Sequence, residues 1–144
     1  MRQPRKKQQE NLLQNKMNEK LSERLYKEHI MELYKSPENI GILENPTHEK
    51  SETNSSCGDE VTIQLIIKNG KIQDAKFHGT GCVMSIVSSS MLTSKIKGMK
   101  VSEISKLDKE DVLELLKIKI KPSRMKCVLL PLIAIKGALK SHYA

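Results

Sequence analysis

The dipeptide Asn69-Gly70, near the middle of the chain, limits the possible fold most strongly. It is favoured in two-residue hairpin turns, because type I′ turns need a positive φ at both central positions. Apolar and polar residues alternate before it over 61–68, and apolar residues return after it over 72–77. Such alternation is typical of half-buried strands. The sequence therefore predicts an antiparallel β-hairpin over residues 60–78.

Amphipathic helices are predicted on both sides of this hairpin. Before it, apolar residues recur at spacings of three to five from Leu21 to Leu33. Ser36-Pro37 is expected to end this helix, because the residue before a proline is disfavoured in helical conformation. After the hairpin, residues 83–97 have a helical pattern, which Gly98 is expected to stop. The apolar face of this helix is predicted to bury Met84, Val87, Met91, Leu92 and Ile96.

The rest of the chain adds two helices and a loop. Asp108 is expected to cap the first of these helices. The last helix is predicted to begin near Cys127, with Pro131 in its first turn, where proline is tolerated. Residues 45–56 are polar and rich in turn formers, which predicts a loop. The expected fold is therefore α+β: a small antiparallel sheet, made of the hairpin 60–78 and an edge strand, packed with helices.

The first twenty residues differ in composition from the rest. They contain six basic and two acidic side chains, a net charge of +4, which is half of the formal charge of +8 on the whole chain. We expect residues 1–20 to form a basic extension, either flexible or a solvated helix, ahead of a single domain over 21–144. Nucleic-acid binding is disfavoured, because no aromatic residues are interleaved to stack on bases. The lysine-rich stretch 95–126 has ten basic and five acidic residues and predicts a solvated face.

Cysteine content and hydropathy bear on the compartment. Three cysteines cannot form a closed set of disulfides within one chain, which favours reduced thiols. The N-terminus lacks the apolar stretch of a secretory signal. The uncharged run 127–135 is too short to span a bilayer. The sequence therefore predicts a cytoplasmic protein without a membrane partner.

Each cysteine lies at a predicted junction between elements. Cys57 ends a polar loop before the first hairpin strand, Cys82 follows a glycine between a strand and a helix, and Cys127 opens the last helix. Free backbone N–H groups at a helix N-terminus stabilise thiolate, the form that binds metal and attacks sulfur. The spacing matches no compact zinc finger, so a shared site would have to be assembled by the fold. Of the four histidines, only His78 is close enough in sequence to Cys82 to be considered.

Asp59, two residues after Cys57, is a candidate fourth ligand. An acidic residue after a glycine is also a common turn residue. As a ligand, its carboxylate would be harder than thiolate and less well matched to iron or zinc. Three soft ligands and one hard ligand describe a site that binds its metal and can also release it.

Four segments in this order resemble the IscU/SufU/NifU N-terminal family of iron–sulfur cluster assembly scaffolds. The opening helix and its exit are LYKEHIMELYKSPENIGIL, and the three cysteine motifs are SCGDEV at 56–61, DAKFHGTGCVMSIVSSSML at 74–92 and RMKC at 124–127. The resemblance covers the chain from about Leu25 onward. It implies that Cys57, Asp59, Cys82 and Cys127 match the family's cluster ligands.

The resemblance also implies a function and partners. It implies a carrier rather than an enzyme, which assembles a labile cluster, [2Fe-2S] being the leading type, and hands it to recipient apo-proteins. A pyridoxal-phosphate cysteine desulfurase would supply the sulfur, with Cys127 or Cys57 as the acceptor. A cluster short of protein ligands could recruit a second subunit, so a homodimer is a further expectation.

One departure leaves an alternative open. Lys126 stands before Cys127 where the IscU branch has a histidine and SufU-like members have a lysine. Its charge is expected to favour the Cys127 thiolate. The alternative is a SufU-like sulfurtransferase that binds zinc in place of the cluster and accepts persulfide sulfur on Cys57.

Overall fold

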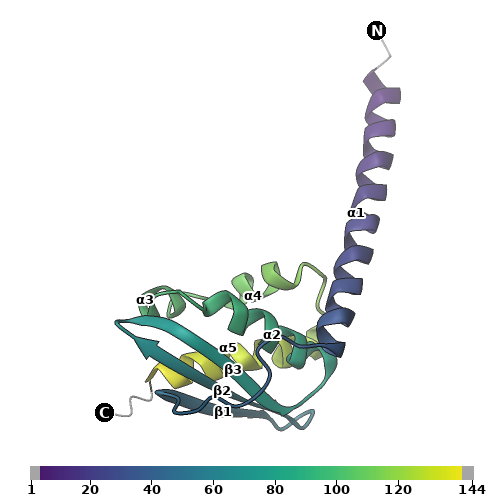
Figure 1. The fold of residues 1–144 in the computed structure, drawn as a ribbon. Coiled ribbons are helices and arrows are strands. Elements are labelled where there is room, and N and C mark those ends of the chain that lie inside the picture. The colour runs from purple at the N-terminus through teal and green to yellow at the C-terminus, as the bar shows by residue number, and fades with distance from the viewer. Residues whose placement is uncertain (1–3, 141–144) are drawn as a thin grey trace.

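The computed structural model describes residues 4–140, with side chains described from residue 9 onward. Figure 1 shows a small sheet packed with helices and one long helix that projects from the body. The fold is α+β, as predicted. In chain order the elements are α1 (Pro4–Lys35), β1 (His48–Asn54), β2 (Asp59–Lys68), β3 (Lys71–Thr80), α2 (Val83–Ile96), α3 (Val101–Ile104), α4 (Lys109–Leu116), the 3-10 turn η1 (Pro122–Arg124) and α5 (Met125–Lys140).

The sheet has three antiparallel strands in the order β1-β2-β3. The predicted turn between β2 and β3 is confirmed, since Asn69 has φ 55° and Gly70 has φ 74°. The predicted edge strand is β1, but its position was not foreseen. It lies within residues 45–56, which were expected to be a loop, so that prediction is wrong. Its sequence HEKSETN is polar because the strand is at the sheet edge, where pairing with β2 rather than apolar burial holds it.

The two faces of the sheet are covered differently. Ile63, Leu65 and Phe77 are fully buried on the face against which α2 and α5 pack. On the other face, the loop 36–47 runs from the end of α1 to β1, and Gln64 Oε1 accepts a hydrogen bond from the Leu43 N–H at 2.8 Å. The same loop pairs with β3 through an Ile40–Phe77 bridge. Gln64 is therefore buried in spite of being polar.

The residues that α2 buries differ from those predicted for its apolar face. Val87, Leu92 and Ile96 are buried, whereas Met84 and Met91 are only half-buried. The remaining buried positions belong to small hydroxyl residues, which are Ser85, Ser88, Ser89, Ser90 and Thr93. Their hydroxyls donate to backbone carbonyl oxygens; Ser88 Oγ, for example, reaches Val128 O on α5 at 2.6 Å. Small side chains with satisfied hydroxyls let α2 and α5 approach closely. A prediction that counts only apolar residues does not find these buried positions.

The predicted helix ends are confirmed where local chemistry fixes them. Asp108 caps α4, with its side chain accepting from the Asp111 N–H, and Gly98 follows α2 with φ 83°.

Helix α5 begins two residues before Cys127, after η1, so Pro131 lies inside the helix rather than in its first turn. That prediction is wrong by about one turn. Proline has no N–H, so the carbonyl oxygen of Cys127 receives no helical hydrogen bond from it.

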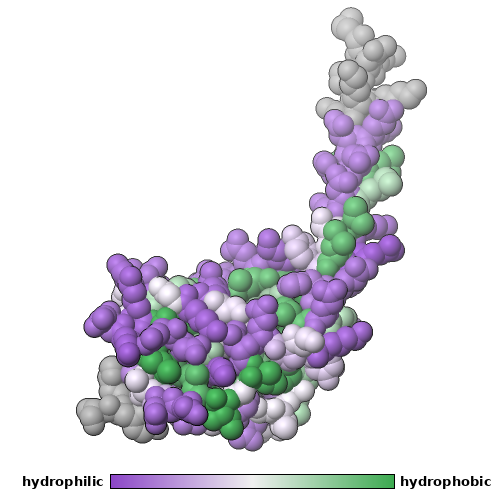
Figure 2. Space-filling view, in the orientation of Figure 1, coloured by the Kyte–Doolittle hydropathy of each residue, from purple (hydrophilic) through white to green (hydrophobic). Residues whose placement is uncertain are grey.

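Helix α1 extends further toward the N-terminus than the predicted helix. It is continuous from Pro4 to Lys35, so the segment predicted as an extension is helical from its fourth residue. Ile30 and Leu33, near its end, are buried in the core. Leu12, Leu13 and Met17 are 59%, 62% and 64% exposed, and Figure 2 shows apolar side chains on the projecting part. Among residues 4–140, no helix combines the length and the apolar character needed to cross a bilayer.

Deleting residues 1–20 is therefore expected to leave the thermal unfolding midpoint nearly unchanged, because the exposed Leu12, Leu13 and Met17 add nothing to the core. Leu33→Ala is the matched control on the same helix and is expected to destabilise the domain by about 2–5 kcal/mol. Differential scanning calorimetry of both variants measures the difference. A truncation that lowers the midpoint as much as Leu33→Ala would mean that the N-terminal part of α1 docks on the domain.

Candidate metal site

Cys57 lies at the tip of the β1–β2 hairpin. The last pair of the ladder is Asn54 with Asp59, so the tip comprises residues 55–58. Gly58 has φ 74°, a conformation that other residues rarely adopt, and it allows the tight return into β2. Cys57 is exposed at this tip. The turn thus presents its thiol at the surface, two residues before a buried position.

That buried position is Asp59, the first residue of β2, which is 4% exposed. Its Oδ1 accepts a hydrogen bond from the backbone N–H of Cys82, the N-cap residue of α2, at 3.1 Å. Gly81 precedes Cys82, and a Cβ there would clash with Ser85 Oγ at 2.2 Å and would touch the Asp59 carboxyl carbon at 3.4 Å. The carboxylate is therefore held at the junction of β3 and α2.

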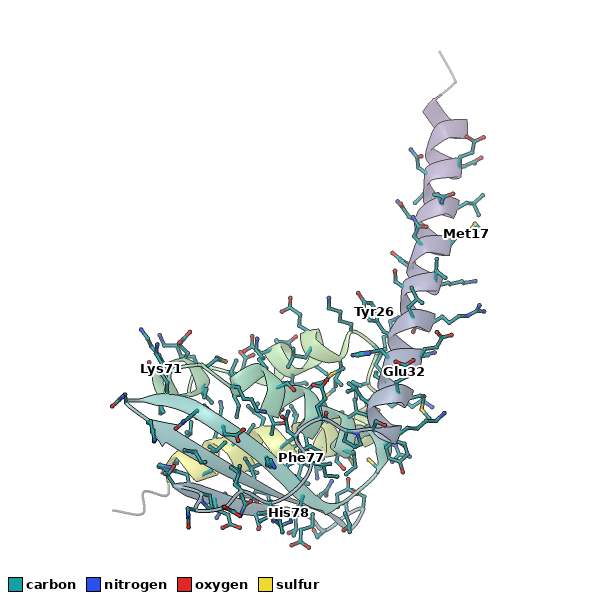
Figure 3. The ribbon with its side chains drawn as sticks, viewed as in Figure 1. Met17, Tyr26, Glu32, Lys71, Phe77 and His78 are labelled. Carbon is teal, nitrogen blue, oxygen red and sulfur yellow. The ribbon has the colours of Figure 1, made fainter. Side chains whose placement is uncertain are left out.

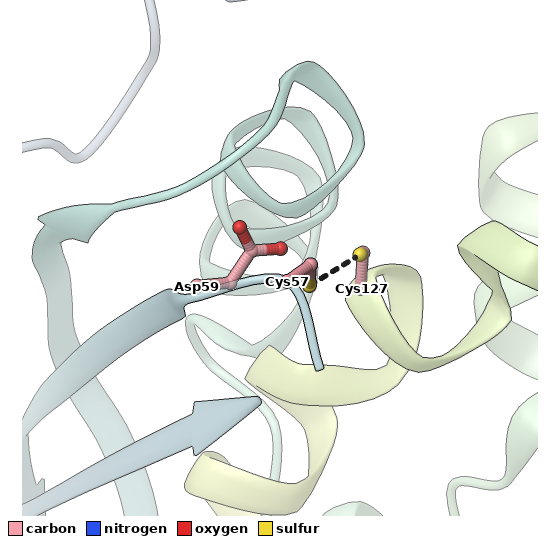
Figure 4. A group of neighbouring side chains, drawn as sticks. All are labelled: Cys57, Asp59 and Cys127. Atoms are coloured by element: carbon pink, nitrogen blue, oxygen red, sulfur yellow. Dashed lines mark hydrogen bonds between the residues drawn. The ribbon is translucent and has the colours of Figure 1, made fainter. Parts of the chain in front are cut away.

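Cys127 approaches the same place from the first turn of α5. It is 1% exposed, and its Sγ lies 3.3 Å from Cys57 Sγ. Figure 4 shows the two thiols facing each other, with the Asp59 carboxylate beside them. One potential ligand atom from each of Cys57, Asp59 and Cys127 lies within 4.8 Å of the others. Residues distant in sequence are thus assembled into one site by the hairpin and α5.

Two other candidates lie outside this group of three. Cys82 contacts Asp59 through its backbone N–H, and its thiol is close enough to affect the pKa of both Asp59 and Cys127. His78 lies on β3, opposite Thr62. Neither contributes a ligand atom to the group within 4.8 Å. The assignment of Cys82 as a ligand therefore stays a prediction from its position beside the site.

The second carboxylate oxygen of Asp59 fits a bound metal. Within the described part of the chain, Asp59 Oδ2 is the buried side-chain oxygen or nitrogen atom that lacks a hydrogen-bond partner. A buried polar atom without a partner costs free energy, which coordination to a cation would offset. Two thiols and a carboxylate form a donor set suited to zinc or to iron in a cluster. The residues present therefore fit a metal or cluster.

Burial and hydrogen bonding change two pKa values at the site. Burial by itself would raise the pKa of Asp59, but the nearby Cys127 and Cys57 thiols and the Cys82 N–H outweigh it and lower that pKa. Burial, followed by the neighbouring Asp59, Cys57 and Cys82, raises the pKa of Cys127 well above its usual range. This direction runs against the expectation that helix position and Lys126 favour a Cys127 thiolate, which stays a prediction. Lys126 is exposed, so its charge is screened by solvent.

Asn54 is a site residue that the sequence did not reveal. It lies three residues before Cys57, and its Nδ2 is 3.9 Å from Cys127 Sγ. An asparagine followed by Ser55-Ser56 is a turn signal, and this signal could have indicated the hairpin tip. Nothing in the sequence links that asparagine to Cys127.

This geometry predicts a strong difference in alkylation between two cysteines. With iodoacetamide at neutral pH, the metal-free protein is expected to be modified first at the exposed Cys57. Cys127 should react at least about tenfold more slowly, because it is buried and its thiol stays protonated. Peptide mass mapping over time measures both rates, and unfolding in urea should equalise them. Equal rates in the folded protein would contradict the described burial of Cys127.

The fold and this site define a small α+β protein with a candidate metal site of two cysteine thiols and a carboxylate. A family model described as the NifU-like N terminal domain matches residues 25–144. The chain belongs to this family, that of the IscU, SufU and NifU iron–sulfur cluster assembly scaffolds. The match begins inside α1, so the projecting part of that helix lies outside it.

The relatives that match this chain include both IscU and SufU proteins. The chain is 35% identical over 132 residues to the iron-sulfur cluster assembly scaffold protein IscU of Thermotoga maritima, covering 81% of this chain and 93% of that protein. It is 32% identical over 136 residues to the zinc-dependent sulfurtransferase SufU of Bacillus subtilis, covering 82% and 92%. A SufU scaffold structure from Fervidobacterium islandicum aligns with a TM-score of 0.66 at 31% identity, covering 76% of this chain and 93% of that one. These relatives are consistent with the family resemblance found in the sequence.

Proposed function

We propose that this protein is an assembly scaffold that holds a labile iron–sulfur cluster on Cys57, Asp59, Cys82 and Cys127 and transfers it to recipient apo-proteins. The observation that carries the proposal is the buried, unpartnered Asp59 Oδ2 beside two thiols whose sulfurs are 3.3 Å apart. The cluster is cargo, so the protein is a carrier without turnover of its own. A [2Fe-2S] cluster is the proposed cargo.

Sulfur would arrive as persulfide from a pyridoxal-phosphate cysteine desulfurase. We infer that Cys57 is the first acceptor, because its thiol is exposed whereas that of Cys127 is buried. The Cys57 thiolate attacks the outer sulfur of the desulfurase persulfide, the S–S bond there breaks, and the desulfurase cysteine leaves as thiolate. Cys57 then carries the persulfide beside Cys127, whose Sγ lies 3.3 Å from Cys57 Sγ.

A zinc-binding sulfurtransferase is the second candidate. It is favoured by the exposed Cys57, by Lys126 before Cys127, and by the relative of that name in Bacillus subtilis. Such a protein would pass persulfide sulfur from the desulfurase to an acceptor while zinc occupies the site. Both candidates use the same residues, so the metal bound distinguishes them.

Anaerobic reconstitution with ferrous iron, cysteine, a cysteine desulfurase and dithiothreitol, the thiol reductant that converts persulfide sulfur to sulfide, tests the scaffold proposal. We expect a brown protein with stoichiometric iron and sulfide, defined by Mössbauer spectroscopy and native mass, which transfers its cluster to an apo-ferredoxin. Native mass also tests the predicted homodimer. A colourless protein that retains one zinc and carries sulfur only as persulfide would replace the scaffold with the second candidate.

Other partners and the compartment stay predictions. Nucleic acid is not among the proposed partners, because no aromatic residues are interleaved with the basic side chains to stack on bases. A cytoplasmic location is proposed from the cysteine content. One relative, from Schizosaccharomyces pombe, is named as a mitochondrial assembly protein.

A further inference from the structure

Asn54 fixes the turn that carries Cys57. It is the last residue of β1, half-buried and opposite Asp59 in the ladder. Its backbone carbonyl oxygen accepts from the N–H groups of Gly58 at 2.8 Å and Cys57 at 3.3 Å. Its side-chain Oδ1 accepts from the Ser56 N–H at 3.2 Å. One residue thus binds three consecutive N–H groups of the hairpin tip.

The same side chain contacts the other sulfur of the site. Asn54 Nδ2 donates to Cys127 Sγ at 3.9 Å, within hydrogen-bond range for sulfur. The Ser56 N–H can only donate, so the amide oxygen must face it and the NH₂ group is left for the sulfur. Since Cys127 lies on α5, this amide links the hairpin tip to the helix.

We propose that Asn54 is a positioning residue that holds the Cys57 turn against Cys127 and polarises the Cys127 sulfur through its amide N–H. This rests on the proposed function, because the bound metal or cluster is what the two sulfurs hold. A hydrogen bond to a ligand sulfur withdraws electron density from it, and such outer partners change metal affinity and electronic properties. Asn54 therefore acts on both the position and the donor strength of the ligands.

Two substitutions separate these roles from simple turn formation. Asn54→Ser keeps a side-chain acceptor for the Ser56 N–H, because serine makes a similar though weaker turn bond. Its hydroxyl is too short to reach Cys127. Asn54→Ala removes both contacts. Thr53→Ala, at the exposed preceding position of β1, is the control that changes the strand and leaves both contacts in place.

The test uses Co²⁺ as the probe, with affinity measured on the apo-protein by chelator competition. We expect Asn54→Ser and Asn54→Ala to bind Co²⁺ at least about tenfold more weakly than wild type. We expect the sulfur-to-cobalt charge-transfer band to move to longer wavelength in both, because the sulfur becomes more electron-rich. Thr53→Ala should match wild type in both measurements.

A turn role alone predicts a different pattern. Asn54→Ser would then keep the wild-type band position and affinity, which would overturn the proposal. That variant also keeps the proposal testable where Asn54→Ala does not fold. A wild-type protein that binds Co²⁺ with this Asn54 dependence but never transfers a cluster would contradict the scaffold function and leave the role of Asn54 intact.

Discussion

A Cys127→Ser variant is expected to fold but to lose metal and cluster binding by well over 100-fold. Removing an outer partner of a ligand typically costs 10–100-fold, and removing a ligand sulfur should cost more. Serine is close in shape but supplies a hard, protonated oxygen in place of a soft sulfur. The remaining Cys57 thiol would lose the neighbour that now lies 3.3 Å away.

Zinc affinity by chelator competition, and iron and sulfide content after reconstitution, measure this loss. Met125→Leu is the control, because it lies in the same turn of α5 and nearly conserves volume. It should bind as wild type does. Retained binding in Cys127→Ser within tenfold of wild type would mean that the metal is held elsewhere.

The same variant also tests the raised pKa of Cys127. In the folded, metal-free protein this raised pKa means that the neutral thiol is favoured over the thiolate. Its contribution to stability is then fully present below the unfolded-state pKa of about 8.5 and is lost as the pH rises above it. Apo wild type should therefore lose stability above about pH 8.5, and Cys127→Ser should lose less. Urea midpoints between pH 7 and 10 measure this, and identical pH profiles would contradict the assignment.

Local chemistry made much of the fold predictable from sequence. The Asn69-Gly70 turn, the Asp108 cap and the Gly98 stop each depend on residues within a few positions of one another. Strand β1 does not, because its polar residues are held by pairing with β2 rather than by an apolar pattern. The start of α5 was misplaced for a related reason. The turn η1 before it leaves no periodic signal, so the sequence pattern predicts a later start, which puts Pro131 in the first turn.

The sequence anticipates that Cys57, Asp59 and Cys127 lie together, from their positions at element junctions and from the family resemblance. Cys82 as a ligand stays a prediction, and the electrostatics of the group did not follow from the sequence. The burial of Cys127, which reverses its expected pKa shift, depends on how α5 packs against the hairpin and α2. The contact from Asn54 likewise depends on that packing, since the two residues are 73 positions apart. Sequence patterns report local geometry, and these properties come from tertiary packing.

Asp59→Ala is expected to slow cluster transfer to an apo-ferredoxin by about tenfold while cluster binding is retained. A hard carboxylate among thiolates is the ligand most easily replaced by a thiol from the recipient. Removing it, and its negative charge, leaves the cluster less open to attack. The lowered pKa of Asp59 keeps this ligand ionised, and its contribution to stability is present above about pH 3.9 and lost as pH falls further.

The structure gives Asp59 a second role that the test must separate. Its Oδ1 holds the Cys82 N–H, so Asp59→Ala also leaves that donor unpaired, and a purely structural role predicts faster cluster loss. Asp59→Asn distinguishes the two, because its amide oxygen can still accept from Cys82 while its neutral head is a poorer ligand than a carboxylate. Slow transfer in both variants, on matched reconstituted samples, would support Asp59 as the exchangeable ligand. Wild-type transfer in Asp59→Asn together with rapid loss in Asp59→Ala would mean that the carboxylate only holds the start of α2 in place.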